Sequence, residues 1–233
     1  MPKRTDAYRV PFAVPELAFD EAVALAADTG TISGDAGPLL ETVVDMLDVL
    51  ERPDEHMDCI QVAGTNGKTS TTEMTSEMLT ACGLAAPAVG NIGKAVSHAA
   101  VDPANDVLCV ELSSFQLDGM FRFRAHIGVL TNITPDHLDR YDHCFQNYAD
   151  SKMRIVRNMT SRDWFVYSGD DEVIWQQLPK YDLRMKQLPF AAKNAVASGA
   201  GDAFLLDGKF TATVGRESVE IDTAKMRIPG LHN

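Results

Sequence analysis

A short run of glycine, hydroxyl and lysine residues has the composition needed to bind phosphate groups. It follows the apolar stretch 59–63 directly and consists of Gly64, Thr65, Asn66, Gly67, Lys68, Thr69 and Ser70. Phosphates need several backbone N–H groups pointing inward, and glycine lets the backbone come close. The positive end of a following helix adds to the attraction. We therefore predict that Lys68 contacts the β/γ-phosphates of a nucleotide and that the Thr69 hydroxyl reaches Mg²⁺.

This loop is a variant of the common phosphate-binding pattern. The strict pattern has a glycine five residues before Gly67, and Val62 occupies that position. The alternative is a strand–turn–helix corner in which the glycines serve only the turn. The combination of strand context, two glycines, a lysine and two hydroxyl residues favours phosphate binding over that alternative.

The elements that would position the loop form an alternating pattern. Apolar runs of strand length are found at 59–63, 106–112, 126–132 and 164–170. Helical candidates are the segment after Gly67 and the stretches 92–100 and 145–159. Strands alternating with helices predict an α/β fold with a mostly parallel sheet and helices on both faces.

The two ends of the chain differ from this central part. Two short helices are predicted before residue 58, over 15–30 and 38–51, and no strand is predicted there. Late in the chain, the Asp207-Gly208 turn between alternating residues predicts a hairpin and thus a small antiparallel piece. We predict a short helical segment at 1–57 and an ATP-binding domain at 58–233. The final residues, IPGLHN, read as the entry to a further helix, so we expect a fragment.

Composition excludes several classes of function. The formal net charge is −12, which disfavours non-specific binding of nucleic acid or of an anionic membrane. No segment has the length and apolarity of a signal peptide or a membrane span, so the cytoplasm is the expected location. The four cysteines form no CxxC pair, and a disulfide framework is not expected.

Several motifs together resemble the Mur ligase family. The loop AGTNGKTS is the form found in Mur ligases and in folylpolyglutamate synthases, and three further segments follow in the family's order: GNIG at 90–93, ELSSFQL at 111–117 and TNITPDHLDRY at 131–141. The segment YADSK at 148–152 follows at family-like spacing. The resemblance covers about residues 58–233. It implies the P-loop fold of the family's central domain and ATP-dependent joining of a carboxylate to an amine.

The resemblance also implies roles for individual residues. Glu111 ends a predicted strand and would bind Mg²⁺ together with Thr69. His137 would help to hold a second metal near the substrate carboxylate and, with Lys68, take part in catalysis. Lys152 would be carbamylated by CO₂, which turns a cation into a metal ligand that also serves catalysis.

Four further residues have roles implied by the same resemblance. The positions near the substrate's carboxyl and phosphate groups are Asn91, Ser113 and Gln116. Asn233 matches the start of the segment that contacts the nucleotide base. Each of the first three is also an ordinary turn or cap residue on its sequence alone.

The resemblance leaves the substrate open between two branches. The central motifs are most similar to the family member that adds D-glutamate to UDP-N-acetylmuramoyl-L-alanine, which implies a UDP-muramoyl nucleotide and D-glutamate as partners. The short N-terminal segment is instead similar to the lead-in of folylpolyglutamate synthases. In both branches ATP and Mg²⁺ would convert a carboxylate into an acyl phosphate that the amine attacks. A simple P-loop kinase or NTPase and a non-catalytic ATP-binding fragment are the remaining alternatives.

Overall fold

The computed structural model describes residues 57–121, 123–191, 201–206 and 208–222. The two helices predicted at 15–30 and 38–51 lie outside the described residues, and so does Asn233, the residue expected near the nucleotide base. The statements about structure below concern the described residues.

One continuous sheet of nine strands forms the centre of the described chain. The strand order is β2-β3-β1-β4-β5-β6-β7-β8-β9. Neighbouring strands from β2 through β7 are parallel, whereas the β7–β8 and β8–β9 pairs are antiparallel. The bounds are β1 Asp58–Ala63, β2 Ala88–Gly90, β3 Val107–Glu111, β4 Ile127–Leu130, β5 Trp164–Ser168, β6 Lys186–Ala191, β7 Gly201–Leu206, β8 Lys209–Val214 and β9 Glu217–Asp222.

Five α-helices and three short 3-10 helices connect these strands within the described residues. The α-helices are α4 Lys68–Ala81, α5 Val96–Ala100, α6 Ser114–Asp118, α7 Phe145–Met153 and α8 Glu172–Gln177. The 3-10 helices are η2 Leu138–Tyr141, η3 Arg154–Val156 and η4 Leu178–Lys180. None of the described helices has both the length and the apolar character needed to cross a membrane.

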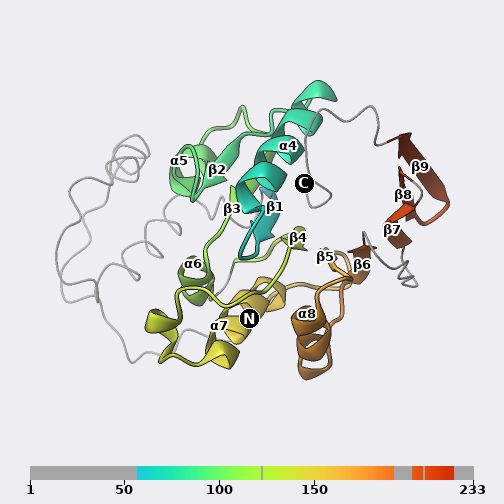
Figure 1. Ribbon diagram of the computed structural model, residues 1–233. Coiled ribbons are helices and arrows are strands. Elements are labelled where there is room, and N and C mark those ends of the chain that lie inside the picture. The colour runs from blue at the N-terminus through green and yellow to red at the C-terminus, as the bar shows by residue number, and fades with distance from the viewer. Residues whose placement is uncertain (1–56, 122, 192–200, 207, 223–233) are drawn as a thin grey trace, which may run out of the picture.

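The direction of the chain connections explains where the helices lie. The β1–α4–β2 connection runs toward one edge of the sheet, and the later connections through α5, α6, α7 and α8 run toward the other edge. Because such crossovers are right-handed, α4 must cover the opposite face from the later helices. Figure 1 shows α6, α7 and α8 together on one side of the strands, with α4 across from them.

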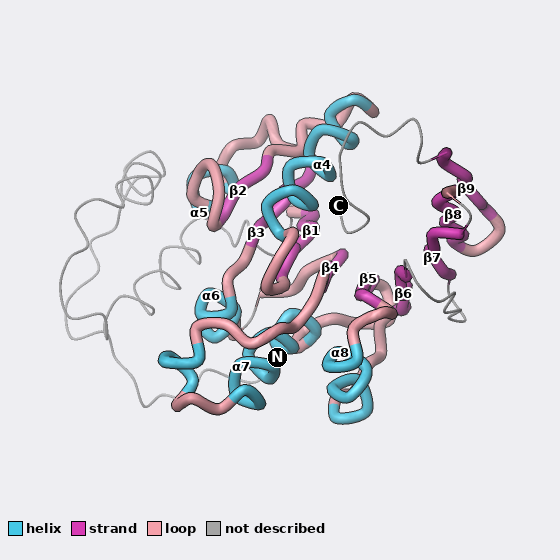
Figure 2. The backbone as a smooth tube through the Cα atoms, viewed as in Figure 1, coloured by secondary structure: helices cyan, strands magenta, loops and turns pink. Residues whose placement is uncertain are grey.

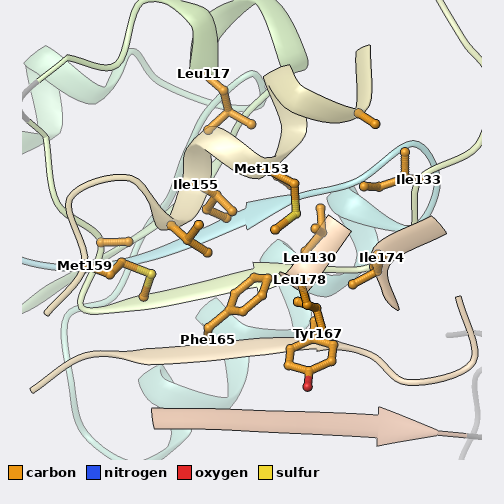
Figure 3. Close-up of a cluster of buried hydrophobic side chains, with 14 of the residues drawn as sticks. Leu117, Leu130, Ile133, Met153, Ile155, Met159, Phe165, Tyr167, Ile174 and Leu178 are labelled. Atoms are coloured by element: carbon orange, nitrogen blue, oxygen red, sulfur yellow. The ribbon is translucent and has the colours of Figure 1, made fainter. Parts of the chain in front are cut away.

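The main core lies between the sheet and the later helices. Strand residues such as Leu130 and Phe165, both fully buried, pack against Met153 of α7 and Ile155 of η3. Figure 3 shows these side chains interleaved between the strands and the helices. A smaller cluster under α5 is continuous with this core, because Leu112 and Phe123 pack against both. The two clusters thus form one continuous apolar core.

The predicted fold class is confirmed, and so is the small antiparallel piece late in the chain: β7 pairs in parallel with β6, and β8 and β9 follow as antiparallel strands of the same sheet. The structure differs from the prediction in two details. Strand β6 was not predicted, since it contains Pro189, which cannot donate to a ladder and argues against an interior strand. The stretch 145–159 forms α7 only as far as Met153 before tightening into η3. Cys59, Cys82, Cys109 and Cys144 all lie in the described residues and form no disulfide bond.

One polar side chain of the core lacks a full set of partners. Gln61 of β1 is 1% exposed; its Nε2 donates to the Met120 sulfur at 3.3 Å, but its Oε1 accepts no hydrogen bond. Because an unpaired buried acceptor is destabilising, we expect Gln61→Leu to raise the free energy of unfolding by about 1 kcal/mol in urea denaturation. The control is Gln177→Leu, which removes the acceptor for Gln146 and Lys180 and should lower stability. A less stable Gln61→Leu protein would contradict the prediction.

Candidate functional site

The phosphate loop lies at the carboxyl end of β1, where that strand is flanked by β3 and β4. Strand β1 ends at Ala63 and α4 begins at Lys68, so the loop turns within four residues. In parallel sheets, ligands bind at the carboxyl ends of strands where the chain connections diverge to opposite sides. The loop occupies this position, as the motif predicted.

Both glycines of the loop are required by the backbone. Gly64 and Gly67 have φ angles of 148° and 79°, which side chains rarely tolerate. A Cβ atom at Gly64 would also overlap the Thr131 side chain. Gly67 caps α4, and α4 has neither a side-chain cap bond nor an acidic residue in its first turn. The positive end of this described helix is therefore not neutralised by the loop itself.

Lys68 is folded back onto the loop that carries it. Its Nζ donates to the Thr65 carbonyl at 2.9 Å and is half-buried. A lysine side chain reaches a neighbouring phosphate by rotation of its flexible stem. The ammonium group is thus beside the loop that would hold the phosphates.

The Glu111 carboxylate accepts hydrogen bonds from two other predicted site residues, Thr69 and Asn91. This carboxylate ends β3 and is 2% exposed. Its Oε2 accepts from the Thr69 hydroxyl at 2.8 Å, and its Oε1 accepts from the Asn91 amide at 3.0 Å. The backbone N–H of Asn91 also donates to the Glu111 carbonyl at 3.0 Å. The loop, the 90–93 segment and the end of β3 therefore meet at one carboxylate.

Lys152 points from α7 into the base of the loop. It is 2% exposed, and its Nζ donates to the Gly64 carbonyl at 2.6 Å. Burial, with a smaller contribution from the nearby charge of Lys68, lowers the pKa of Lys152 to about 7, while Asp136 and Glu111 oppose the shift. The amine thus lies inside the site, at the base of the loop.

His137 lies beyond the carboxyl end of β4, and its side chain is mostly exposed. Its backbone is left-handed with φ 48°, and its side chain is 57% exposed. The ring Nε2 is 3.6 Å from Asp136, and among the described residues it makes no hydrogen bond to Glu111 or Lys152. No three His, Cys, Asp or Glu side chains of the described chain gather as a metal cluster. The structure therefore brings Thr69, Glu111 and Asn91 together, but not His137.

Ser113 and Gln116 form the amino-terminal cap of α6. The Gln116 N–H donates to Ser113 Oγ at 3.4 Å, and the Gln116 side-chain oxygen accepts from the Ser113 N–H at 2.9 Å. This reciprocal pair is a capping box, so both residues have a structural role beside the predicted substrate role. Ser113 follows Glu111 by two residues in the chain, and Gln116 follows it by five.

Two residues that contact the loop had no role in the sequence analysis. Asn132 bonds the Thr65–Asn66 backbone, and the Tyr148 hydroxyl lies 3.0 Å from the Thr65 hydroxyl. A signal for Asn132 was present, because it is the last residue of the strand predicted at 126–132 and belongs to the motif at 131–141. Tyr148 begins the YADSK segment at 148–152, but within that segment the sequence analysis gave a role only to Lys152.

Comparisons with known proteins agree with this geometry. The family model described as the Mur ligase middle domain matches residues 62–233. The chain is 57% identical over 136 residues to UDP-N-acetylmuramoylalanine--D-glutamate ligase of Bifidobacterium adolescentis, covering 58% of this chain and 26% of the relative. It is 38% identical over 174 residues to the protein of the same name from Christiangramia forsetii, covering 75% of this chain and 38% of the relative. The chain thus spans well under half the length of these relatives.

Solved structures show the same fold at low sequence identity. A UDP-N-acetylmuramoyl-L-alanyl-D-glutamate--2,6-diaminopimelate ligase aligns with a TM-score of 0.56 at 18% identity, over 76% of this chain and 41% of that one. The MurF ligase of Thermotoga maritima, solved in complex with ADP, aligns with a TM-score of 0.52 at 16% identity, over 78% and 44% of the two chains.

Proposed function

This chain belongs to the Mur ligase family, and from that premise we propose that it is the ATP-binding part of a cytoplasmic ligase of peptidoglycan precursor synthesis. The proposed reaction joins D-glutamate to UDP-N-acetylmuramoyl-L-alanine. The relatives named above support this substrate pair over a folate. In this proposal residues 58–233 are the middle domain, and residues 1–57 are a separate short segment.

The observation that carries the proposal is the meeting of the loop with a buried carboxylate. Thr69 of the loop donates to Glu111 at 2.8 Å, beside the free positive end of α4. These hard oxygen donors fit Mg²⁺, which binds through one or two protein groups and completes its shell with phosphate oxygens and water. When bound, Mg²⁺ would neutralise charge on the phosphates.

The chain's own residues have distinct tasks in this mechanism. The substrate carboxylate attacks the γ-phosphate of ATP, which gives an acyl phosphate and ADP, and the amine then displaces phosphate from the acyl carbon. Lys68 and the α4 amino terminus would stabilise charge on the transferred phosphoryl group. Asn91, held by Glu111, and the capped pair Ser113 and Gln116 would orient the substrate through neutral groups.

Lys152 and His137 complete the proposed site. The buried amine of Lys152, with its pKa lowered to about 7, is largely neutral near physiological pH, and only the neutral amine reacts with CO₂. The proposal assigns it a carbamate and a role as metal ligand. His137 would have to rotate inward when substrate binds, because its ring is now mostly exposed.

The test compares nucleotide binding with ligation. We expect residues 1–233 to bind ATP with Mg²⁺ in calorimetry but to form no amide, because positioning two substrates supplies much of the rate and the chain matches only part of its relatives. The complete natural protein should release ADP and phosphate only when both UDP-N-acetylmuramoyl-L-alanine and D-glutamate are present.

Other outcomes would point to the alternatives. ATP turnover that needs neither the carboxylate nor the amine would support a simple kinase or NTPase. Addition of glutamate to a folate, without reaction of the muramoyl nucleotide, would overturn the substrate assignment. Amide formation by residues 1–233 alone would refute the need for further chain.

A further inference from the structure

The phosphate loop is held from outside by the residues that follow β4. Strands β1 and β4 pair in parallel, with Ala63 opposite Leu130. The pairing continues beyond both strands, because the Thr131 N–H donates to the Ala63 carbonyl at 3.0 Å and the Thr65 N–H donates to the Asn132 carbonyl at 3.1 Å. The bond from the Thr65 N–H is the last of these backbone bonds among the described residues, and the loop turns away after it.

The Asn132 side chain takes over where the backbone pairing ends. Its Oδ1 accepts from the N–H groups of Thr65 at 3.1 Å and Asn66 at 2.9 Å, and its Nδ2 donates to the Asn66 carbonyl at 2.9 Å. The loop offers this side-chain amide two N–H donors and one carbonyl acceptor, and this pattern identifies which terminal atom of Asn132 is the oxygen. The carboxamide therefore acts as one more peptide group pairing with the loop.

Neighbouring hydroxyl groups fasten the same segment. Thr131 Oγ1 donates to the Asn66 carbonyl at 2.7 Å. The Thr65 hydroxyl accepts from the Thr134 N–H at 3.0 Å and donates to the Thr134 carbonyl at 3.0 Å. The loop is thus attached to the segment that leads to His137, three residues beyond Thr134. Figure 2 draws both connections, the one between β1 and α4 and the one after β4, as loops.

These contacts decide which backbone groups remain for a phosphate. The N–H groups of Thr65 and Asn66 are committed to Asn132. The first N–H groups of a helix have no partner within the helix, so those that follow Asn66 at the start of α4 remain for a ligand. A loop fixed in this way binds without first having to be ordered.

We propose that Asn132 is a positioning residue that keeps the phosphate loop in its nucleotide-binding form and sets the distance between the loop and the segment carrying His137. The proposal rests on the proposed function for its ligand, ATP with Mg²⁺. It does not rest on that function for the effect on the loop itself, which can be measured without a nucleotide.

The experiment uses Asn132→Ala and a matched control in residues 1–233. The control is Asn158→Ala, because the half-buried Asn158 amide also donates to backbone carbonyls, those of Phe121 at 3.1 Å and Phe123 at 2.7 Å, outside the loop. Amide hydrogen exchange of Asn66 reports the loop, and calorimetry reports ATP–Mg²⁺ affinity. Thermal unfolding verifies that both variants fold.

We expect Asn132→Ala to lose protection at the Asn66 amide and to bind ATP–Mg²⁺ about tenfold more weakly or worse, since two or more hydrogen bonds to the loop disappear. Asn158→Ala should lower the melting temperature to a similar degree and change neither readout. Asn132→Asp keeps the oxygen that accepts from the Thr65 and Asn66 N–H groups but loses the donor to the Asn66 carbonyl, so it should restore part of the protection of Asn66. Unchanged affinity and protection in Asn132→Ala would overturn the proposal, and so would an Asn132→Asp variant as unprotected as Asn132→Ala.

Failure of the proposed function gives a different result. If the wild-type chain binds no nucleotide, the proposed function fails, and the exchange of Asn66 alone then decides whether Asn132 holds the loop.

Discussion

Replacing Lys68 by alanine is expected to weaken ATP–Mg²⁺ binding roughly tenfold to a hundredfold, about 1.5–3 kcal/mol, while the fold remains intact. The ammonium group lies beside the loop with its Nζ on the Thr65 carbonyl at 2.9 Å. A hydrogen bond between a charged donor and a phosphate is among the stronger kinds, and alanine removes it. The bond to Thr65 is half-buried, so water replaces it in the variant.

Calorimetry with ATP and Mg²⁺ measures the effect, and thermal unfolding verifies the fold. Lys180→Ala is the matched control, because Lys180 Nζ also donates to uncharged oxygens, those of Gln177 at 2.9 Å and Gln146 at 3.1 Å, and to no residue of the loop among the described residues. The control should bind nucleotide like the wild type. Equal affinity of Lys68→Ala and the wild type would mean that the loop has only a structural role.

Replacing Lys152 by methionine is expected to stabilise the protein near neutral pH by an amount on the order of 2–4 kcal/mol. Burial, with a smaller contribution from the Lys68 charge, lowers the pKa of Lys152 from 10.5 to about 7 in the folded chain. The folded chain therefore binds a proton at Lys152 less strongly than the unfolded chain does. Methionine fills a similar volume and has no charge to desolvate, although the Gly64 carbonyl loses a donor.

The direction of the pH dependence follows from the two pKa values. Between about pH 7 and about pH 10 the unfolded chain binds more protons at Lys152 than the folded chain, so the wild-type free energy of unfolding rises with pH across that window. Below about pH 7 both states are protonated, and the full destabilisation is present. The advantage of Lys152→Met should thus be largest at neutral or lower pH and should shrink toward about pH 10.

Urea denaturation over this pH window measures the difference between the two proteins. A difference that does not change with pH would contradict the lowered pKa, and a less stable variant at neutral pH would show that the bond to Gly64 outweighs desolvation. Lys180→Met, at an exposed position, should show neither effect.

The same neutral amine underlies the proposed carbamate. The nitrogen of the neutral amine would form a bond to the carbon of CO₂ and release one proton, so that the neutral amine becomes an anionic carbamate. Isotopically labelled CO₂ should give a carbamate resonance in the wild type above about pH 7, and none in Lys152→Met. Its absence from the wild type at alkaline pH would refute the assignment.

The local part of the site was readable from the sequence. Gly64 and Gly67 indicate a backbone conformation that residues with a side chain rarely adopt, and Lys68 follows them at the start of a helix. Apolar runs after polar breaks similarly predicted β1, β3, β4 and β5, because their side chains must be buried on a parallel sheet. Backbone sterics at the glycines and the need to bury consecutive apolar side chains determine these features. Both can be predicted from residues that are close together in the chain.

Contacts between distant segments depended on the tertiary structure. Glu111 meets Thr69 because β3 pairs with β1, and Lys152 is buried because α7 packs its inner face against β4 and β5. A lysine in a helix has the same local pattern whether it faces water or the core, so sequence periodicity could not place it. Strand β6 was not predicted because Pro189 disfavours a strand. Pairing with β5 and β7 nevertheless keeps this segment in the sheet. Asn132 contacts the phosphate loop because β4 pairs with β1, which brings the Asn132 side-chain amide beside the turn of the loop.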